Sequence, residues 1–412
     1  MRTRIPLLSV LAVAAVVMLG GARAVTAQQV VKLGEGETLT ISGFISATLF
    51  SDRGLFSSFG QGQNAEISAS PANQRGIDQS FTDGDFRNSR LRFDFAAQPV
   101  LGKWAPKATV EVDFFGAFNG VPPFGDEQPQ IRGRVIYADL SNGRTTLRIG
   151  QDWSPSFAET PVSLTHIAFP LGYGASGKIG WRFPGLFLFQ DLSAAGAPLN
   201  VQLQLAAMKG SGPTAPGNAR DSLNNIGTGE ASGLPQLEGK LNFAKKSANL
   251  SWSAYVLGHI DWKDTSGTGV TGSNLTGTAF EAGGSIAPGH LTVHGNFYFG
   301  KAVGQLFAHI NQSAPAQGDI RGWGAWAQAG YDFTPHWSLL GFYGLDQPDL
   351  QRFTQDHPTA TLARQGSHVG DALLRFRAGR YALGLEYYRS VTQWNTGVTS
   401  ADQYALSVLY SF

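Results

Sequence analysis

The chain ends with the sequence DQYALSVLYSF at residues 402–412. Every second side chain in this stretch is apolar or aromatic: Tyr404, Leu406, Val408, Tyr410 and Phe412. The positions between them are small or polar, with Leu409 as the exception. This period of two predicts a β-strand with one apolar face. Because an exposed apolar edge strand promotes aggregation, the strand must pair with an earlier one. Its natural partner is the first strand of the mature chain, near residues 38–50, and that pairing would close a barrel.

Short turns alternate strictly with longer polar loops along the rest of the chain. The turns lie at 245–249, 287–290, 334–336 and 378–380, and the loops at 210–234, 261–277, 301–318, 345–366 and 393–401. About sixteen alternating strands, with short periplasmic turns and long extracellular loops, are typical of a transmembrane antiparallel β-barrel of the bacterial outer membrane. The sequence therefore predicts an all-β fold of this kind, with an aqueous lumen.

The composition agrees with this prediction. Charged residues make up 15% of the chain, below the roughly 25% of ordinary soluble domains. There is no cysteine, which excludes a disulfide scaffold and thiolate metal sites. The alternative is a soluble secreted all-β protein, a sandwich or propeller whose strands would also alternate.

The first 27 residues have the features of a secretory signal peptide. Arg2 and Arg4 precede an apolar run at 5–20, and Ala27 ends a small-residue cleavage site, with Ala24 as the alternative. We expect a mature barrel of residues 28–412. Cleavage leaves 28 Lys and Arg against 30 Asp and Glu, a balance that does not favour nucleic acid as a partner.

Arginines occupy many positions that the alternation turns toward the lumen. We expect the pore to be lined by Arg90, Arg92, Arg132, Arg134, Arg148, Arg182, Arg375 and Arg377, with Asp94, Glu111 and Asp113 on neighbouring strands. The planar guanidinium fork matches carboxylates and phosphates, so such a wall would concentrate anions. Alternatively, the three acids neutralise the wall, and Asp371 does the same for the last two arginines.

The faces of two further strands follow from the same alternation. Arg132 and Arg134 are expected to alternate with residues that include Val135 and Tyr137 on the opposite face. Trp181 is expected to face outward, next to an inward Arg182. Residues 183–198 do not alternate clearly and stay unassigned.

Residues 153–174 contain three prolines and no alternation, and we expect them to form an inward-folded constriction loop. Asp152, Trp153, Glu159 and His166 belong to this loop or its entry, and the three titratable residues could face basic residues across the pore. The position of the segment is similar to that of the third loop of general porins, which narrows the barrel. An exposed surface loop is the alternative.

Two short motifs carry a family resemblance. Asn88-Ser89-Arg90-Leu91-Arg92-Phe93 and the later Leu147-Arg148-Ile149-Gly150-Gln151-Asp152-Trp153 resemble the DcaP-type outer-membrane porins. The resemblance implies a sixteen-stranded trimeric barrel for dicarboxylates and other small anions. It also implies a helical N-terminal extension, for which this chain has little room. The terminal Tyr410 and Phe412 resemble the signal for the barrel-assembly machinery.

Enzymatic motifs are absent from the sequence. There is no Gly-x-Ser-x-Gly, phosphate loop or His-Glu-x-x-His. His290 and His294 would lie about 13 Å apart on a strand, too far to share a metal. We therefore expect no enzyme, metal or cofactor, but an outer-membrane porin that contacts lipid and passes small hydrophilic solutes, with a preference for anions such as dicarboxylates. The alternative within the class is a general or phosphate-type porin.

Overall fold

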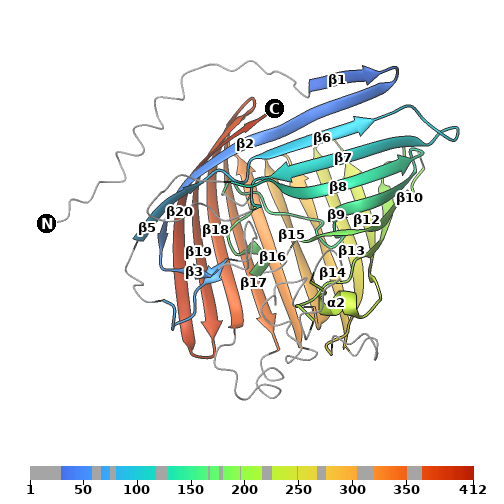
Figure 1. Cartoon of the computed structure of the whole chain (residues 1–412). Coiled ribbons are helices and arrows are strands. Elements are labelled where there is room, and N and C mark those ends of the chain that lie inside the picture. Colours follow the sequence, from blue (N-terminus) through green and yellow to red (C-terminus); the bar gives the residue numbers. More distant parts are fainter. Residues whose placement is uncertain are drawn as a thin grey trace.

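The computed structural model describes twelve stretches of the chain: 29–57, 66–74, 80–116, 129–165, 168–175, 180–194, 196–215, 225–247, 249–266, 275–303, 320–349 and 364–412. The expected signal peptide lies outside them. Almost all regular structure in these stretches is β-strand, arranged as one barrel (Figure 1). In the part of the chain so described, no helix is long and apolar enough to span a membrane.

The elements follow in chain order, with the numbering of Figure 1. They are β1 (Gln29–Gly34), β2 (Glu37–Arg53), β3 (Phe56–Ser57), β4 (Ile67–Ser68), β5 (Ser80–Asp85), β6 (Arg90–Ala96), β7 (Ala105–Asp113), β8 (Arg132–Ser141), β9 (Thr145–Trp153), η2 (Tyr173–Ala175), β10 (Arg182–Asp191), β11 (Asn200–Met208), α2 (Thr228–Ala231), β12 (Gln236–Lys246), β13 (Leu250–Lys263), β14 (Leu275–Pro288), β15 (Leu291–Lys301), β16 (Arg321–Asp332), β17 (Trp337–Pro348), β18 (Arg364–Ala378), β19 (Tyr381–Trp394) and β20 (Gly397–Ser411).

The first and last strands of the barrel wall close the barrel, as the sequence predicts. β20 pairs antiparallel with β2, from Phe44 opposite Ser411 to Arg53 opposite Asp402. The last residue also takes part. The N–H of Phe412 donates to the carbonyl of Gly43 at 3.0 Å, and the carbonyl of Phe412 accepts from the N–H of Gly43 at 3.1 Å. Closure leaves no open edge in the hydrocarbon region, where an unpaired backbone group would be costly.

The wall of the barrel has the predicted 16 strands. The main sheet contains 18 strands. Of these, β5 and β6 share one place, because both pair with β2, one along each half of its length. β1 lies outside the ring. It pairs with the start of β2, where β20 has ended, so the described residues before β2 form a strand and not the helical extension that the family resemblance implies.

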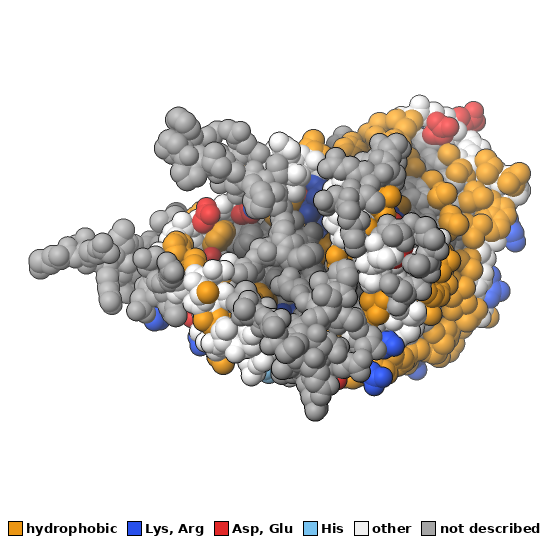
Figure 2. All heavy atoms as spheres, turned by 60° about the horizontal axis from the view of Figure 1, so that its bottom comes forward, with side chains coloured by type: hydrophobic (Ala, Val, Ile, Leu, Met, Phe, Trp, Pro, Cys, Tyr) orange, Lys and Arg blue, Asp and Glu red, His pale blue; other side chains and the backbone are white. Residues whose placement is uncertain are grey.

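Apolar side chains alternate between the two faces of the wall. In β17, Leu339 is 54% exposed and its neighbour Leu340 only 6%, so the first faces lipid and the second the interior. Figure 2 shows apolar side chains spread over the outer surface of one side of the barrel. This pattern is the one expected of a lipid-facing sheet.

A bulge in β8 overturns part of the predicted alternation. The pairing of β7 with β8 shifts register after Glu111. Beyond this point the faces exchange: Val135 is buried, whereas Ile136 is 49% exposed. Tyr137 turns inward and lies 3.6 Å below the guanidinium of Arg148. The extra residue of a bulge moves every later side chain to the other face.

Other local predictions were also wrong. Trp181 does not face lipid; it packs against the buried cluster that includes Phe183 and Met208. The unassigned stretch contains β10, which accommodates Pro184 opposite Gln151 of β9. The predicted loop 393–401 is a tight hairpin between β19 and β20.

Gly43 provides a test of the closure. A Cβ at this position would lie 2.2 Å from the carbonyl oxygen of Arg90 and 3.1 Å from the Phe412 ring. We expect Gly43→Ala to lower the free energy of unfolding by about 1–3 kcal/mol, the usual cost of overpacking, in urea titrations of the barrel in lipid vesicles. Gly341→Ala is the control, because no atom lies within 4 Å of its Cβ position. Equal effects of the two changes would contradict this account.

Candidate functional site

One side of the lumen carries an arginine wall on β6, β8, β9 and β10, with acids from β7 between them. We use this name for six residues: Arg90, Arg92, Arg132, Arg134, Arg148 and Arg182. All six come from sequence-predicted inward positions. The strands that carry them are neighbours in the sheet, so side chains far apart in the sequence meet here.

Two acids of β7 pair with the arginines of β8. Asp113 accepts from Arg132 at 2.7 Å and from Arg134 at 2.6 Å. Glu111 accepts from Arg134 at 2.7 Å. Asp113 and Arg134 are almost fully buried, so these are charge-assisted bonds in a protected setting.

Two further arginines of the wall are also paired. Arg148 bonds Asp139 at 2.7 Å and contacts Asp152 at the end of the same strand. Arg92 bonds Asp94 at 2.8 Å. Asp152 therefore pairs with Arg148 of its own strand and not with a basic residue across the pore.

Arg90 and Arg182 differ from the other four arginines. In the described stretches neither has a carboxylate within ion-pair distance. The Arg90 guanidinium lies 5.2 Å from the centre of the Phe44 ring and donates to the Asn88 amide oxygen at 3.3 Å. The Arg182 guanidinium lies 4.8 Å from the Trp153 ring. Such cation–π contacts hold a guanidinium in place and leave its charge uncompensated.

These two arginines belong to a local group with excess positive charge. Arg90 and Arg182 interact electrostatically with each other and with Arg132, Arg134 and Asp113. When Glu111 is included, four arginines face two carboxylates. The group therefore carries two net positive charges on one side of the lumen.

Arg375 and Arg377 lie elsewhere. Both are on β18 near the short turn at 379–380, where Arg375 donates to Ser338 Oγ at 3.2 Å and Arg377 lies 3.7 Å from Asp332. Asp371, their expected partner, instead lies against the carboxyl of Glu386. These two arginines are not part of the arginine wall.

Residues 154–165 and 168–174, which we call the inner segment, come after β9 and bond to the facing strands. Near its start, Ser154 Oγ donates to Glu238 of β12 at 2.7 Å. Glu159 accepts from Ser253 Oγ of β13 at 3.1 Å and lies 3.5 Å from His294 of β15. His166 lies outside the described residues.

The second half of the inner segment continues along the same wall. Gln328 of β16 bonds both backbone groups of Val162, at 2.7 and 2.8 Å. The N–H of Leu164 donates to Glu386 of β19 at 3.0 Å. These polar partners are buried residues of the lumen wall that the sequence did not single out.

Apolar contacts hold the inner segment as well. Leu164 packs with Leu340, Leu373 and Ala382, and with the partly buried Leu409. Leu409 is the residue that broke the alternation of the last strand, so its inward apolar side chain is explained by this contact. Consecutive leucines, such as Leu339-Leu340 and Leu373-Leu374, also break the alternation of their strands. They indicate a wall that is apolar on both faces at these positions.

The end of the inner segment is enclosed by aromatic rings. Tyr173 is fully buried and packs edge-on against Trp326 and Phe342, with ring centres 5.6 and 6.2 Å away. Next to it, Gly172 has a positive φ of 71°, and a Cβ there would lie 2.2 Å from Tyr388 Oη. The fit leaves no room for a side chain.

A second stretch, residues 66–74, lies against the same region. Ser68 N–H donates to Ser390 Oγ of β19 at 3.2 Å, and Tyr388 Oη donates to the carbonyl of Glu66 at 3.2 Å. Glu66 is buried, and one of its carboxyl oxygens has no hydrogen-bond partner. Burial, with a contribution from Asp52, raises the pKa of Glu66 to about 8.

Comparisons with known proteins give the fold. No protein-family model and no curated protein matches the chain by sequence. Its structure is similar to that of the outer-membrane channel DcaP of Acinetobacter baumannii, with a TM-score of 0.66 and 17% identity over 93% of this chain and 99% of that one. The fold is that of an outer-membrane channel. The resemblance to DcaP-type barrels is confirmed at the level of the fold.

Two more distant structures have the same architecture. The outer-membrane protein OmpT of Vibrio cholerae gives a TM-score of 0.53 at 13% identity, covering 93% of this chain and 100% of that chain. OprB of Pseudomonas putida gives 0.52 at 9% identity, covering 90% and 94%. These likenesses extend over nearly the whole of each barrel.

The shifted pKa of Glu66 predicts a pH dependence of stability. Between pH 4.5 and about 8 the carboxyl ionises in the unfolded chain but stays protonated in the folded one. Its contribution to stability is therefore present at low pH and is lost as the pH rises toward 8. We expect the urea midpoint of unfolding to fall as the pH rises over this range. In the Glu66→Gln variant this fall should be smaller. Glu35→Gln, an exposed carboxyl in a turn, should leave the pH profile unchanged; a profile insensitive to Glu66→Gln would refute the assignment.

Proposed function

We propose that the protein is an outer-membrane porin for passive diffusion of small hydrophilic solutes, with a preference for anions such as dicarboxylates. The observation that carries the proposal is the uncompensated charge of Arg90 and Arg182 within the arginine wall. Two guanidinium groups in one local group match a solute with two carboxylates. Both side chains are only partly exposed, and weak binding of a solute there would allow the release that diffusion requires.

The opposite wall supports this preference. Two of its acids are already engaged. Glu238 accepts from Ser154 and from the N–H of Ser156, and it lies 3.0 Å from His259. Asp346 pairs with Arg364 at 2.6 Å. These carboxylates do not reach across to neutralise Arg90 or Arg182, and the charge excess remains beside the passage.

We further propose that the inner segment, with Trp153 at its entry, narrows the lumen. The hydrogen bonds from β12 to β19 support this role because they hold the segment along the wall. The Trp153 ring stacks on Phe157 with centres 4.3 Å apart and lies under Arg182. The entry of the inner segment is thus in contact with the arginine wall.

Export and assembly form the remaining part of the proposal. Residues 1–27 would direct export, and Tyr410 and Phe412 would be read by the barrel-assembly machinery. A homotrimer is supported by the fold likeness, since one of the similar structures is a trimer form of OmpT. Cross-linking in native outer membranes would test the trimer.

The arginine proposal is tested by reversal potentials in planar bilayers under a KCl gradient. We expect Arg90→Gln and Arg182→Gln each to lower the anion-to-cation permeability ratio about two- to fivefold, since a unit charge in an aqueous lumen contributes roughly 0.5–1 kcal/mol. Current block by succinate should weaken in parallel. Glu111→Gln should shift the ratio in the opposite direction.

Arg144→Gln is the matched control, because it removes the same charge from an exposed turn. A wild-type channel without anion preference would mean a general porin. If Arg144→Gln lost the anion preference while Arg90→Gln and Arg182→Gln kept it, the residues that set selectivity would lie outside the arginine wall.

The inner segment is tested at Gly172. We expect Gly172→Ala to displace the segment from Tyr388 and to raise single-channel conductance or its variance. Gly196→Ala is the matched control: it has a similar φ of 77° but no atom within 4 Å of its Cβ position. If the two variants conduct alike, the close fit at Gly172 does not control the pore.

A further inference from the structure

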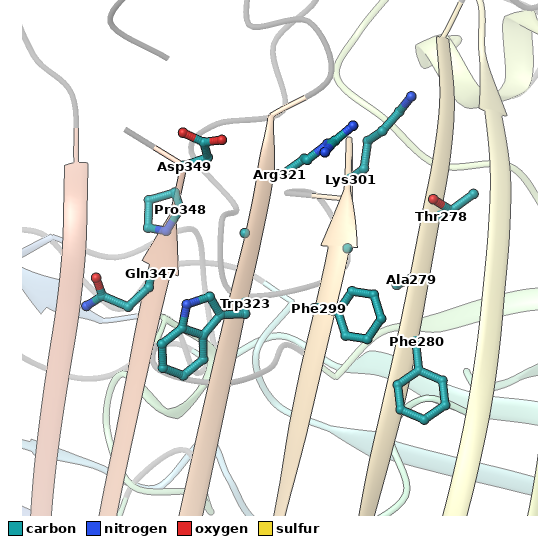
Figure 3. Close-up of a pocket in the computed structure, with 12 residues that line it drawn as sticks. Thr278, Ala279, Phe280, Phe299, Lys301, Arg321, Trp323, Gln347, Pro348 and Asp349 are labelled. Carbon is teal, nitrogen blue, oxygen red and sulfur yellow. The ribbon is translucent and has the colours of Figure 1, made fainter. Parts of the chain in front are cut away.

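The outer face of the barrel has a groove at the end of the strands that leads into the longer loops. It lies over β14, β15, β16 and β17 (Figure 3). Its floor carries three outward aromatic side chains, Phe280, Phe299 and Trp323, each roughly half exposed. Lys301 and Arg321 lie above them at the ends of their strands. The volume of about 720 Å³ falls within the roughly 300–1,000 Å³ of small-ligand sites.

Strand register explains this layering. Lys301 is directly opposite Arg321 in the β15–β16 pair, and Phe299 is opposite Trp323. Phe280 is opposite Phe299 in the β14–β15 pair, with ring centres 5.6 Å apart. Residues two positions apart share a face, so the cations stand about 7 Å above the aromatic rings along the strands.

The charges of the groove favour an anion. Like charges directly opposite each other on neighbouring strands repel, and here Lys301 faces Arg321. The groove also contains one carboxylate, Asp349, which Figure 3 shows on the other side of the Arg321 side chain from Lys301. The Arg321 guanidinium extends toward Lys301. Among the described residues, the lining therefore holds two cations and one acid, with the cations together.

We propose that this groove binds an outer-leaflet lipid with a phosphorylated headgroup. Its acyl chains would lie over the aromatic floor, in line with the place of aromatic residues at a membrane interface. Its phosphate would accept hydrogen bonds from Arg321 and Lys301, as anionic headgroups do at basic sites beside membrane-spanning elements. The charge lies where headgroups lie, at the end of the apolar surface, which favours a lipid over a second copy of the chain.

The test is native mass spectrometry of the detergent-solubilised full barrel with added lipid A that carries two phosphates. We expect retention of lipid A by the Lys301→Gln/Arg321→Gln double variant to be lower than that of the wild type by about tenfold or more. The reason is that the variant has lost two cations near the membrane surface. Lipid A without phosphate should bind weakly and equally to both proteins. Lys245→Gln/Lys246→Gln is the matched control, because it removes two exposed cations beside a short turn on the opposite rim.

Two results would overturn the proposal. One is equal retention of phosphorylated lipid A by the wild type and the Lys301/Arg321 variant. The other is a change of oligomeric state in that variant with lipid retention unchanged, which would make the groove a subunit contact. Gel mobility with and without heating shows that each variant is folded before it is compared.

Discussion

Closure of the sheet by β2 and β20 is the constraint on which the rest of the molecule depends. Every backbone N–H and C=O in the hydrocarbon layer needs a partner within the protein, so the first and last strands of the wall must meet. They do so through the terminal residue, where Phe412 exchanges two backbone hydrogen bonds with Gly43. Where β20 ends, β1 continues along the same edge of β2.

The closed wall lines the lumen differently on its two sides. On β6 to β10, arginines outnumber the acids within their reach, and aromatic rings hold Arg90 and Arg182 in position. On β12 to β19, buried polar and apolar side chains hold the inner segment instead. The two sides meet at Trp153, which ends β9 and lies beside Arg182. In the proposed porin, the charge of the passage is set by one wall and its shape by the opposite one.

The sequence predicted the barrel well because strand period and turn length are local properties. It also predicted lumen-facing positions for the six arginines. It could not separate Arg90 from Arg132, since ion pairing depends on which residues lie across from each other on neighbouring strands. The β8 bulge was unpredicted for the same reason. Leu409 was visible as an exception, but the cluster against which it packs includes Leu164, which lies 245 positions earlier in the chain.

The contacts of the inner segment have a consequence for the order of folding. The segment comes after β9, yet its partners Glu238, Gln328 and Glu386 belong to strands that follow it in the chain. Contacts between distant parts of a chain form late, because the loop between them must close first. The segment can therefore reach its place only after β12 to β19 have assembled. A barrel released from its assembly before that step would be complete in its wall and unfinished in its interior.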